Sequence, residues 1–235
     1  MEPPSAEYPL GTDRVGRDLL ATMIAGTPLT LRIGFLAGLL GVGLATLLAF
    51  VAAFYGGLID TVIQTVVDIG LTIPSLLILI IIAVSIQGPI SVNQMALVVA
   101  STAWLWPTRV IRSEVLSLKQ RAYVELARVS GMSGLEIIVK ELIPNLLPYI
   151  MASLVGSVSS AILASVGLEA LGLGPIDSPT LGMTIYWVIL YAAVIQGWWW
   201  WWIPPIVILL LVFVGLFLIS IGMDELANPR LRTSA

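Results

Sequence analysis

Three carboxylates stand in long apolar stretches of this 235-residue chain and are its first candidates for chemistry. Asp60 and Asp68 are separated by about 12 Å along a helix at 1.5 Å per residue, and Glu169 closes a later apolar run. An unpaired Asp at mid-bilayer costs about 2.5 to 3.5 kcal/mol. Each side chain must therefore face protein or water. There it can act in gating or ion transfer, or form a structural hydrogen bond to a helix end, which is the more ordinary role for Asp68.

Histidine and cysteine are both absent. Most zinc and haem sites, and Ser-His catalysis, need an imidazole or a thiolate. We therefore expect no metal site and no cofactor in this chain. It also lacks a G-x-x-x-x-G-K-[ST] phosphate-binding loop, so any nucleotide must be hydrolysed by another chain. The formal charge of -3 gives no indication of a nucleic-acid partner.

The composition is that of an all-α, polytopic helical membrane protein, because 58% of residues are hydrophobic, 11% are charged and the mean hydropathy is +1.02. A crossing helix needs about 20 mostly apolar residues. We predict kinks at Pro74 and Pro107. The run 183–195 is too short to cross. Five crossing helices are predicted, at 33–55, 60–86, 92–111, 145–168 and 203–223.

Five crossings place eight of the eleven basic residues on one face, which the positive-inside rule identifies as cytoplasmic. These are Arg109, Arg112, Lys119, Arg121, Arg128, Lys140, Arg230 and Arg232. The predicted organisation is an extracytoplasmic segment at 1–32, a single transmembrane domain at 33–223 and a cytoplasmic tail at 224–235. Trp198 to Trp202 are expected to form an aromatic belt at the outer interface.

The polar stretch 119–144 between the third and fourth spans predicts two short helices joined by a sharp turn. Tyr123, Leu126, Ala127 and Ser130 have the spacing of one helical face, and Gly131 ends that helix. Ser133 and Glu136 form a capping box that begins the second helix. Its expected inner face is Leu135, Ile138, Val139 and Leu142, and Pro144 is expected to open the next span. Such a hairpin can bind a soluble partner, although many cytoplasmic loops of this length are basic and helical.

The hairpin resembles a motif of the membrane subunits of ATP-binding-cassette importers. That motif reads E-A-A, three residues, G, nine residues, then I-x-L-P. The chain has Glu125-Leu126-Ala127, then Gly131, then Glu141-Leu142-Ile143-Pro144, with the spacing kept throughout. Three positions depart from the motif, and Glu141 places a carboxylate where a histidine or an apolar residue is more usual.

Other segments are similar to the C-type permease of dipeptide, oligopeptide and nickel importers. Residues 10–18 resemble the family's LGTD-x-x-GRD segment, 171–174 its outer loop and 228–231 its DPRLR-like end. Members generally carry one more transmembrane helix before these segments, and the resemblance implies that this first helix is missing here. Such a helix would explain why Arg14, Arg17 and Arg32 fall on the outer side.

The resemblance implies a subunit without catalysis of its own, which forms half of a pathway for peptides or similar small solutes in the plasma (inner) membrane. The implied partners are a second permease subunit, two ATPase subunits that bind ATP and Mg²⁺, an extracytoplasmic binding protein and the lipid bilayer. The implied ATPase contact lies on the hairpin, at Glu125, Leu126, Ala127, Arg128, Ser130, Gly131, Met132 and Ser133.

Two other classes of function stay open. An ion-coupled secondary transporter would use Asp68 and Glu169 as proton or ion sites and would need no ATPase. An intramembrane aspartyl enzyme would need Asp60 and Asp68 on facing helices, whereas their spacing puts them along one helix.

Overall fold

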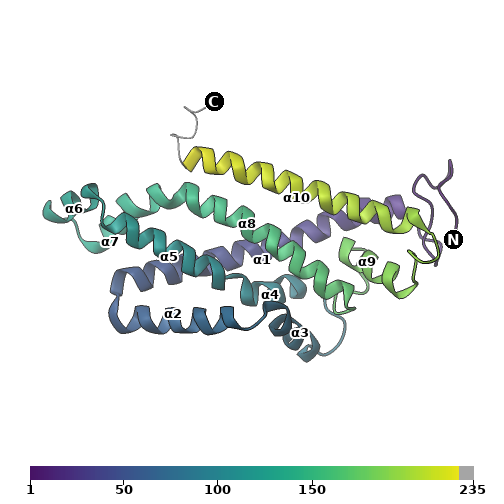
Figure 1. Ribbon diagram of the computed structural model, residues 1–235, viewed down its shortest axis with the longest axis horizontal. Helices are drawn as coiled ribbons and strands as arrows, with labels where there is room; N and C mark the ends of the chain where they lie inside the picture. Colours follow the sequence, from purple (N-terminus) through teal and green to yellow (C-terminus); the bar gives the residue numbers. More distant parts are fainter. Residues whose placement is uncertain (228–235) are drawn as a thin grey trace.

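The computed structural model describes residues 1–227 and is almost wholly helical over that range (Figure 1). The prediction of a polytopic helical membrane protein is confirmed for these residues, because three helices are long and apolar enough to cross a membrane. Most helices run along one long axis. The N-terminus and α9 (Leu181–Leu190) lie at one end, and the hairpin helices α6 (Ala122–Val129) and α7 (Gly134–Ile137) lie at the other.

Helix α1 (Leu19–Tyr55) begins 14 residues before the predicted first span. Its N-cap is Asp18, whose carboxylate accepts a hydrogen bond from the Leu20 N–H at 2.8 Å. Residues 19–32, expected to precede the first span, are therefore the first turns of this helix. Small residues line its packed face, and a Cβ on Gly38 would lie 2.9 Å from the backbone nitrogen of Val158. Glycine here allows α1 and α8 (Ile143–Ala170) to touch closely.

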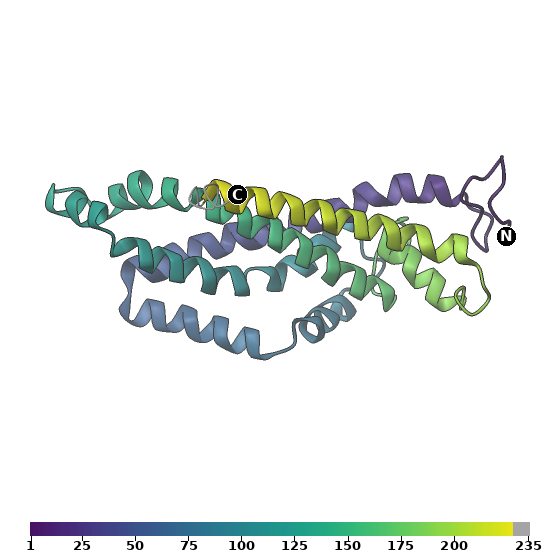
Figure 2. The same ribbon diagram turned by 45° about the horizontal axis from the view of Figure 1, so that its top comes forward.

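The predicted second span is a bent pair of helices, α2 (Gly57–Thr72) and α3 (Ser75–Ser85), which meet at 88°. The break falls at Ile73 and Pro74, because proline disfavours the helical conformation in the residue before it. Figure 2 shows α2 set apart from the rest of the bundle, below α1 in that view. Only Val67 of α2 is buried.

The predicted third span is divided into α4 (Val92–Ala103) and α5 (Leu105–Lys119) at Trp104. Pro107, where a kink was predicted, is the third residue of α5. The first turn of a helix leaves its N–H groups without partners inside the helix, so proline fits there without breaking a hydrogen bond. The helix break at Trp104 precedes the proline by three residues, on the side where a proline ring clashes with the helix backbone.

Pro144 lies in the first turn of α8, as predicted, but the second hairpin helix is not separated from that span. The chain passes from α7 through a π-helical turn at Ile138–Leu142 directly into α8. The Ile143 N–H donates to the Ile138 carbonyl, five residues back. Pro144 follows at once and has no N–H, so the α-helical ladder is interrupted where the π turn replaces it.

Helix α9 is a short apolar helix, and α10 (Trp199–Ala227) is the last one described. The predicted tryptophan belt at the outer interface stays a prediction, and exposure varies along the run. Trp201 is 2% exposed and stacks on Tyr191 with ring centroids 5.8 Å apart, while the guanidinium of Arg14 lies 4.7 Å from the Tyr191 centroid. The N-terminal segment thus packs on these rings, and only Trp199 of the run is largely exposed.

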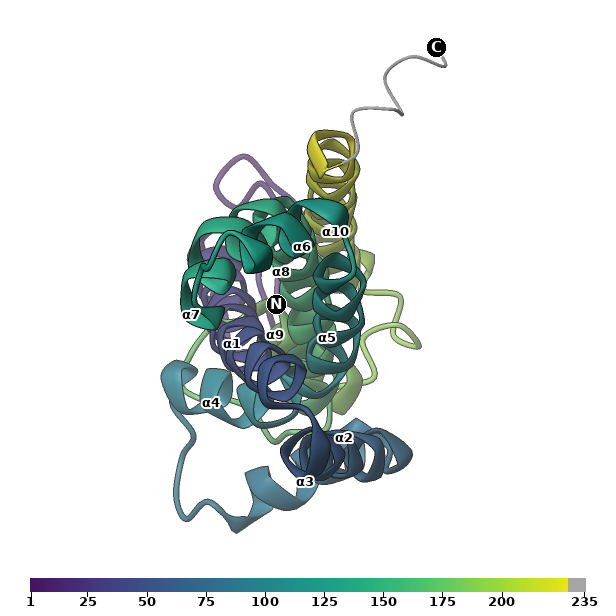
Figure 3. The same ribbon diagram turned by 90° about the vertical axis from the view of Figure 1, so that its left-hand side faces the viewer.

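The count of five crossings stays a prediction. By length and composition, the described residues contain three crossing helices, or four if the bent pair α2–α3 is one span. The helices α4 and α5 are each too short alone. Figure 3, viewed along the bundle, shows α10 at its edge, away from α2 and α3. Arg230 and Arg232 lie outside the described residues, as does most of the predicted tail.

Candidate functional site

The hairpin presents most of its predicted contact residues to solvent. Glu125, Arg128, Ser130, Gly131 and Ser133 are exposed. Leu126 is 68% exposed and Met132 is half-buried. Ala127 differs, because it is 8% exposed and belongs to the hydrophobic cluster beneath the hairpin. Ala127 therefore packs inside the protein, while the neighbouring predicted contact residues form a surface that a partner could reach.

The hairpin is held to the bundle by buried apolar side chains and by a cap on α1. Val124 and Ile137 pack with Ala53 and Val115. The Lys119 ammonium donates a hydrogen bond to the Ala53 carbonyl, near the end of α1. Lysine at a helix C-terminus also interacts favourably with the helix dipole. The hairpin is thus a fixed projection of the bundle.

The predicted inner face of the second hairpin helix is partly wrong. Leu135 and Val139 are 68% and 61% exposed, whereas Ile137 and Leu142 are 7% and 2% exposed. The two buried residues are five apart because the π turn lies between them. A reading based on α-helical spacing assigns the wrong face at such a turn.

The capping box predicted at the sharp turn is present. Ser133 accepts from the Glu136 N–H at 3.3 Å, and the Glu136 carboxylate accepts from the Ser133 N–H at 2.9 Å. Gly131 has a φ of +84°, a conformation that glycine adopts at no steric cost. Tyr123 is partly buried here; burial raises the pKa of its phenol, and its hydroxyl has no partner among the described residues.

Asp60 and Asp68 both form ion pairs that join α2 to α5. Asp60 accepts two hydrogen bonds from the guanidinium of Arg112, and Asp68 accepts one from Arg109. The Asp60 and Arg112 side chains are each 22% exposed, and those of Asp68 and Arg109 are 58% and 43% exposed. The partner of Asp68 is thus a guanidinium, not the helix end that the sequence suggested.

Glu169 lies at the end of α8 and is fully buried. Its Oε2 accepts a hydrogen bond from the hydroxyl of Thr180, the N-cap of α9, while Oε1 has no partner among the described residues. A Cβ on Gly182 would lie 2.4 Å from Oε2, so glycine makes room for the carboxylate. Glu169 therefore ties α8 to α9.

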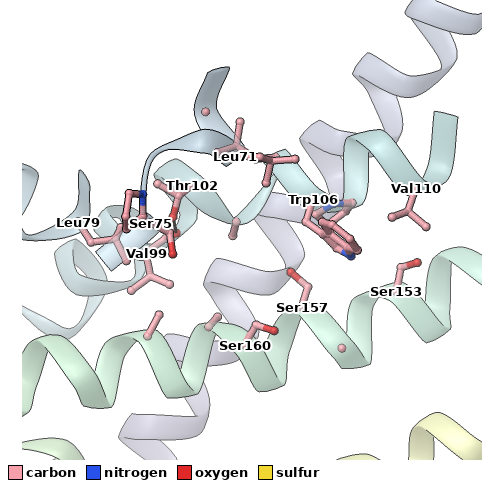
Figure 4. Close-up of a pocket in the computed structure, with 18 of the residues that line it drawn as sticks. Leu71, Ser75, Leu79, Val99, Thr102, Trp106, Val110, Ser153, Ser157 and Ser160 are labelled. Carbon is pink, nitrogen blue, oxygen red and sulfur yellow. Dashed lines mark hydrogen bonds between the residues drawn. The ribbon is translucent and has the colours of Figure 1, made fainter. Parts of the chain in front are cut away.

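A cavity of about 490 Å³ lies between the α2–α3 bend, the α4–α5 break and α8 (Figure 4). Gly156, Ser157 and Ser160 of α8 line it. Small residues in membrane helices often allow close helix packing. A Cβ on Gly156, however, would meet nothing within 4 Å. Close packing is instead the role of Gly38 and Gly41 on α1.

The described wall of this cavity carries no Asp, Glu, Lys or Arg side chain. Its polar side chains are hydroxyls and the indole of Trp106. The lining residues are Gly70, Leu71, Ile73, Pro74, Ser75, Leu79, Val99, Thr102, Ala103, Leu105, Trp106, Pro107, Val110, Ser153, Gly156, Ser157, Ser160, Ala161 and Ala164. Asp68 and Glu169, the carboxylates that ion coupling would require, are thus absent from this wall, and nothing here favours a secondary transporter.

Residues 41–233 match the family described as the binding-protein-dependent transport system inner membrane component. The chain belongs to this family. The match includes the hairpin, the two ion pairs and all the cavity-lining helices. The residues that match the family are thus the ones that form the hairpin, the ion pairs and the cavity.

Two curated relatives illustrate the similarity. The oligopeptide transport system permease protein OppC of Mycobacterium tuberculosis is 30% identical over 174 residues, which cover 74% of this chain and 60% of OppC. The dipeptide transport system permease protein DppC of Bacillus subtilis is 28% identical over 98% of this chain and 71% of DppC. The chain thus spans about 60% of the length of the first of these relatives.

Among solved structures, a chain of the MetNI methionine ABC transporter matches with a TM-score of 0.67 and 18% sequence identity. The match covers 90% of this chain and 97% of the MetNI chain. At this level of identity the likeness shows the fold alone.

Sequence reasoning missed the partners of the carboxylates and the cavity. The distribution of basic residues indicates on which side Arg109 and Arg112 lie, but not that they pair with Asp68 and Asp60. The spacing of Ser153, Ser157 and Ser160 is that of one helical face, and this was the signal that could have identified a polar wall.

Proposed function

We propose that this chain is the transmembrane permease subunit of an ATP-driven, binding-protein-dependent importer of peptides, with no catalysis of its own. The observation that carries the proposal is the hairpin, which projects from one end of the bundle with Glu125, Leu126 and Arg128 exposed. Family membership and the peptide permeases among the relatives support it.

In this proposal, two ATPase subunits bind ATP and Mg²⁺ and dock on the hairpins of this chain and of a second permease subunit. The second hairpin helix is continuous with α8, so displacement of the hairpin moves the wall of the cavity. An extracytoplasmic binding protein delivers the peptide at the opposite end. The chain would then supply half of the pathway across the plasma (inner) membrane.

Single-cysteine crosslinking tests the ATPase contact, and the absence of native cysteine makes the background clean. Cysteine at Glu125 or Ser130 should form a crosslink with a cysteine in the cognate ATPase subunit. Val15 is 66% exposed in the N-terminal segment at the other end of the bundle, so V15C is a matched control that should not react. An intact complex that gives no crosslink from either hairpin position would refute the contact.

Uptake measurements test the energy source. Proteoliposomes containing the complete complex and its binding protein should accumulate peptide only when ATP is present on the ATPase side. An ion gradient should have no effect in the absence of ATP. Uptake driven by the gradient alone would replace this proposal with a secondary transporter.

A further inference from the structure

Serine and threonine hydroxyls in these helices usually donate to a carbonyl one turn earlier, as is common for such side chains in helices. Thr46 donates to Val42 at 2.7 Å, Ser85 to Ile81 at 2.7 Å, and Ser159 to Val155 at 3.0 Å. Ser153, Ser157 and Ser160 of α8 are exceptions. Within residues 1–227, their hydroxyls have no hydrogen-bond partner in the protein.

The three exceptional serines share one face of α8, and that face is a wall of the cavity. In Figure 4 the hydroxyls of Ser153 and Ser157 project from α8 toward the side where Trp106 and Val110 of α5 lie. Ser157 is only 9% exposed. Ser153 is half-buried and Ser160 is exposed, and the three unpaired hydroxyls are free to hydrogen-bond to a molecule that enters the cavity.

The opposite wall has similar chemistry. Thr102 makes only a long contact, at 3.5 Å, with the Val99 carbonyl, and Trp106 is 62% exposed along the cavity. A hydroxyl both donates and accepts a hydrogen bond. A wall of hydroxyls without charged side chains therefore complements neutral groups that also do both. The backbone amides of a peptide have this property, and its charged ends do not.

We propose that Ser153, Ser157 and Ser160 bind the backbone amides of a peptide as it passes through the cavity. This inference rests on the proposed import function. Recognition of the backbone, which all peptides share, leaves the choice of side chains to other parts of the complex. The cavity volume of about 490 Å³ is within the range of small-molecule sites, about 300 to 1,000 Å³.

The test compares two isomeric probes, trialanine and trisarcosine, in proteoliposomes containing the complete complex and its binding protein. Trisarcosine lacks the internal amide N–H groups. The wild-type complex should transport trialanine faster, and the triple variant S153A/S157A/S160A should lower the ratio of the two rates about 2- to 10-fold, as expected for one lost hydrogen bond. S159A is the matched control, because Ser159 already donates to Val155.

Any preference of the binding protein itself is common to all variants and cancels in this comparison. If the triple variant imports both probes with an unchanged ratio, the serine site is refuted and the importer remains. If the wild-type complex shows no ATP-dependent uptake of either probe, the proposed peptide import fails instead. A ratio that falls equally in S159A would also refute the site, because it would show a general effect on α8.

A second measurement does not depend on transport. In the purified complex, S157C should react with N-ethylmaleimide, and millimolar trialanine should slow that reaction several-fold. S159C should show no protection by trialanine. An S157C thiol that does not react, or that reacts at the same rate with trialanine present, would contradict binding at this wall.

Discussion

Two glycines of the same helical bundle should respond in opposite ways to the same substitution. Alanine at position 38 adds a Cβ that would lie 2.8 Å from Val158 Cγ2, 2.9 Å from its nitrogen and 3.1 Å from its Cα. Two of these are backbone atoms of α8 and cannot rotate away. Helices α1 and α8 must therefore separate, and overpacking of this kind costs about 1 to 3 kcal/mol.

Alanine at position 156 meets nothing within 4 Å. Alanine is favoured over glycine inside a helix by about 0.5 to 1 kcal/mol, so G156A should be slightly stabilising. The two variants should then differ by about 1.5 to 4 kcal/mol in free energy of unfolding. At about 2 to 4 °C per kcal/mol for a chain of this size, their melting temperatures should differ by about 3 to 16 °C.

Thermal unfolding in detergent, followed by the fluorescence of the eight tryptophans, measures this difference. Gly43 lies on α1, as Gly38 does, but a Cβ there meets nothing within 4 Å, so G43A is the control for a substitution in α1 itself. If G156A lost as much stability as G38A, the space beside Gly156 would be filled and the cavity argument would fail.

Three further outcomes are expected. Asp60→Asn should lower the free energy of unfolding by about 1.5 to 3 kcal/mol, and Asp68→Asn should lower it by less than about 1 kcal/mol. The difference is expected because the ion pair of Asp60 is the more buried one. Equal losses of stability in thermal melts would contradict this ranking. Tyr123→Phe removes a buried hydroxyl that has no partner among the described residues. The isolated chain should be equally stable or more stable by up to about 1 to 3 kcal/mol. A clear loss of stability in thermal melts would show that this hydroxyl makes a hydrogen bond. Gly156→Leu should lower ATP-dependent peptide uptake, because a leucine side chain would narrow the cavity, and uptake at the wild-type rate would place the pathway elsewhere.

Local signals in the sequence predicted the hairpin well. The capping box at Ser133 and the turn at Gly131 depend on residues at most a few positions apart, and both are present. The π turn before Pro144 could not be read from spacing, because it changes the spacing itself. The exposed faces of Leu135 and Val139 follow from that one irregular turn.

Contacts between distant segments were beyond sequence reasoning. A single sequence does not show that Asp60 lies beside Arg112, 52 residues later, or that Thr180 donates to Glu169. The tryptophans illustrate the same limit. Composition alone favours a lipid interface, whereas the burial of Trp201 depends on Tyr191 and on the way the N-terminal segment folds back.

The continuity of the hairpin with α8 explains how one helix can serve both ends of the molecule. From Ser133 to Ser157 the backbone remains helical, a length of about 36 Å at 1.5 Å per residue. A continuous helix transmits rotation and tilt along its axis, whereas a flexible loop does not. The second hairpin helix and the unpaired serines are therefore parts of one continuous helix, whereas Glu125, Leu126 and Arg128 lie on α6, before the turn at Gly131. A force that tilts the hairpin must also change the position of the hydroxyls that face the cavity.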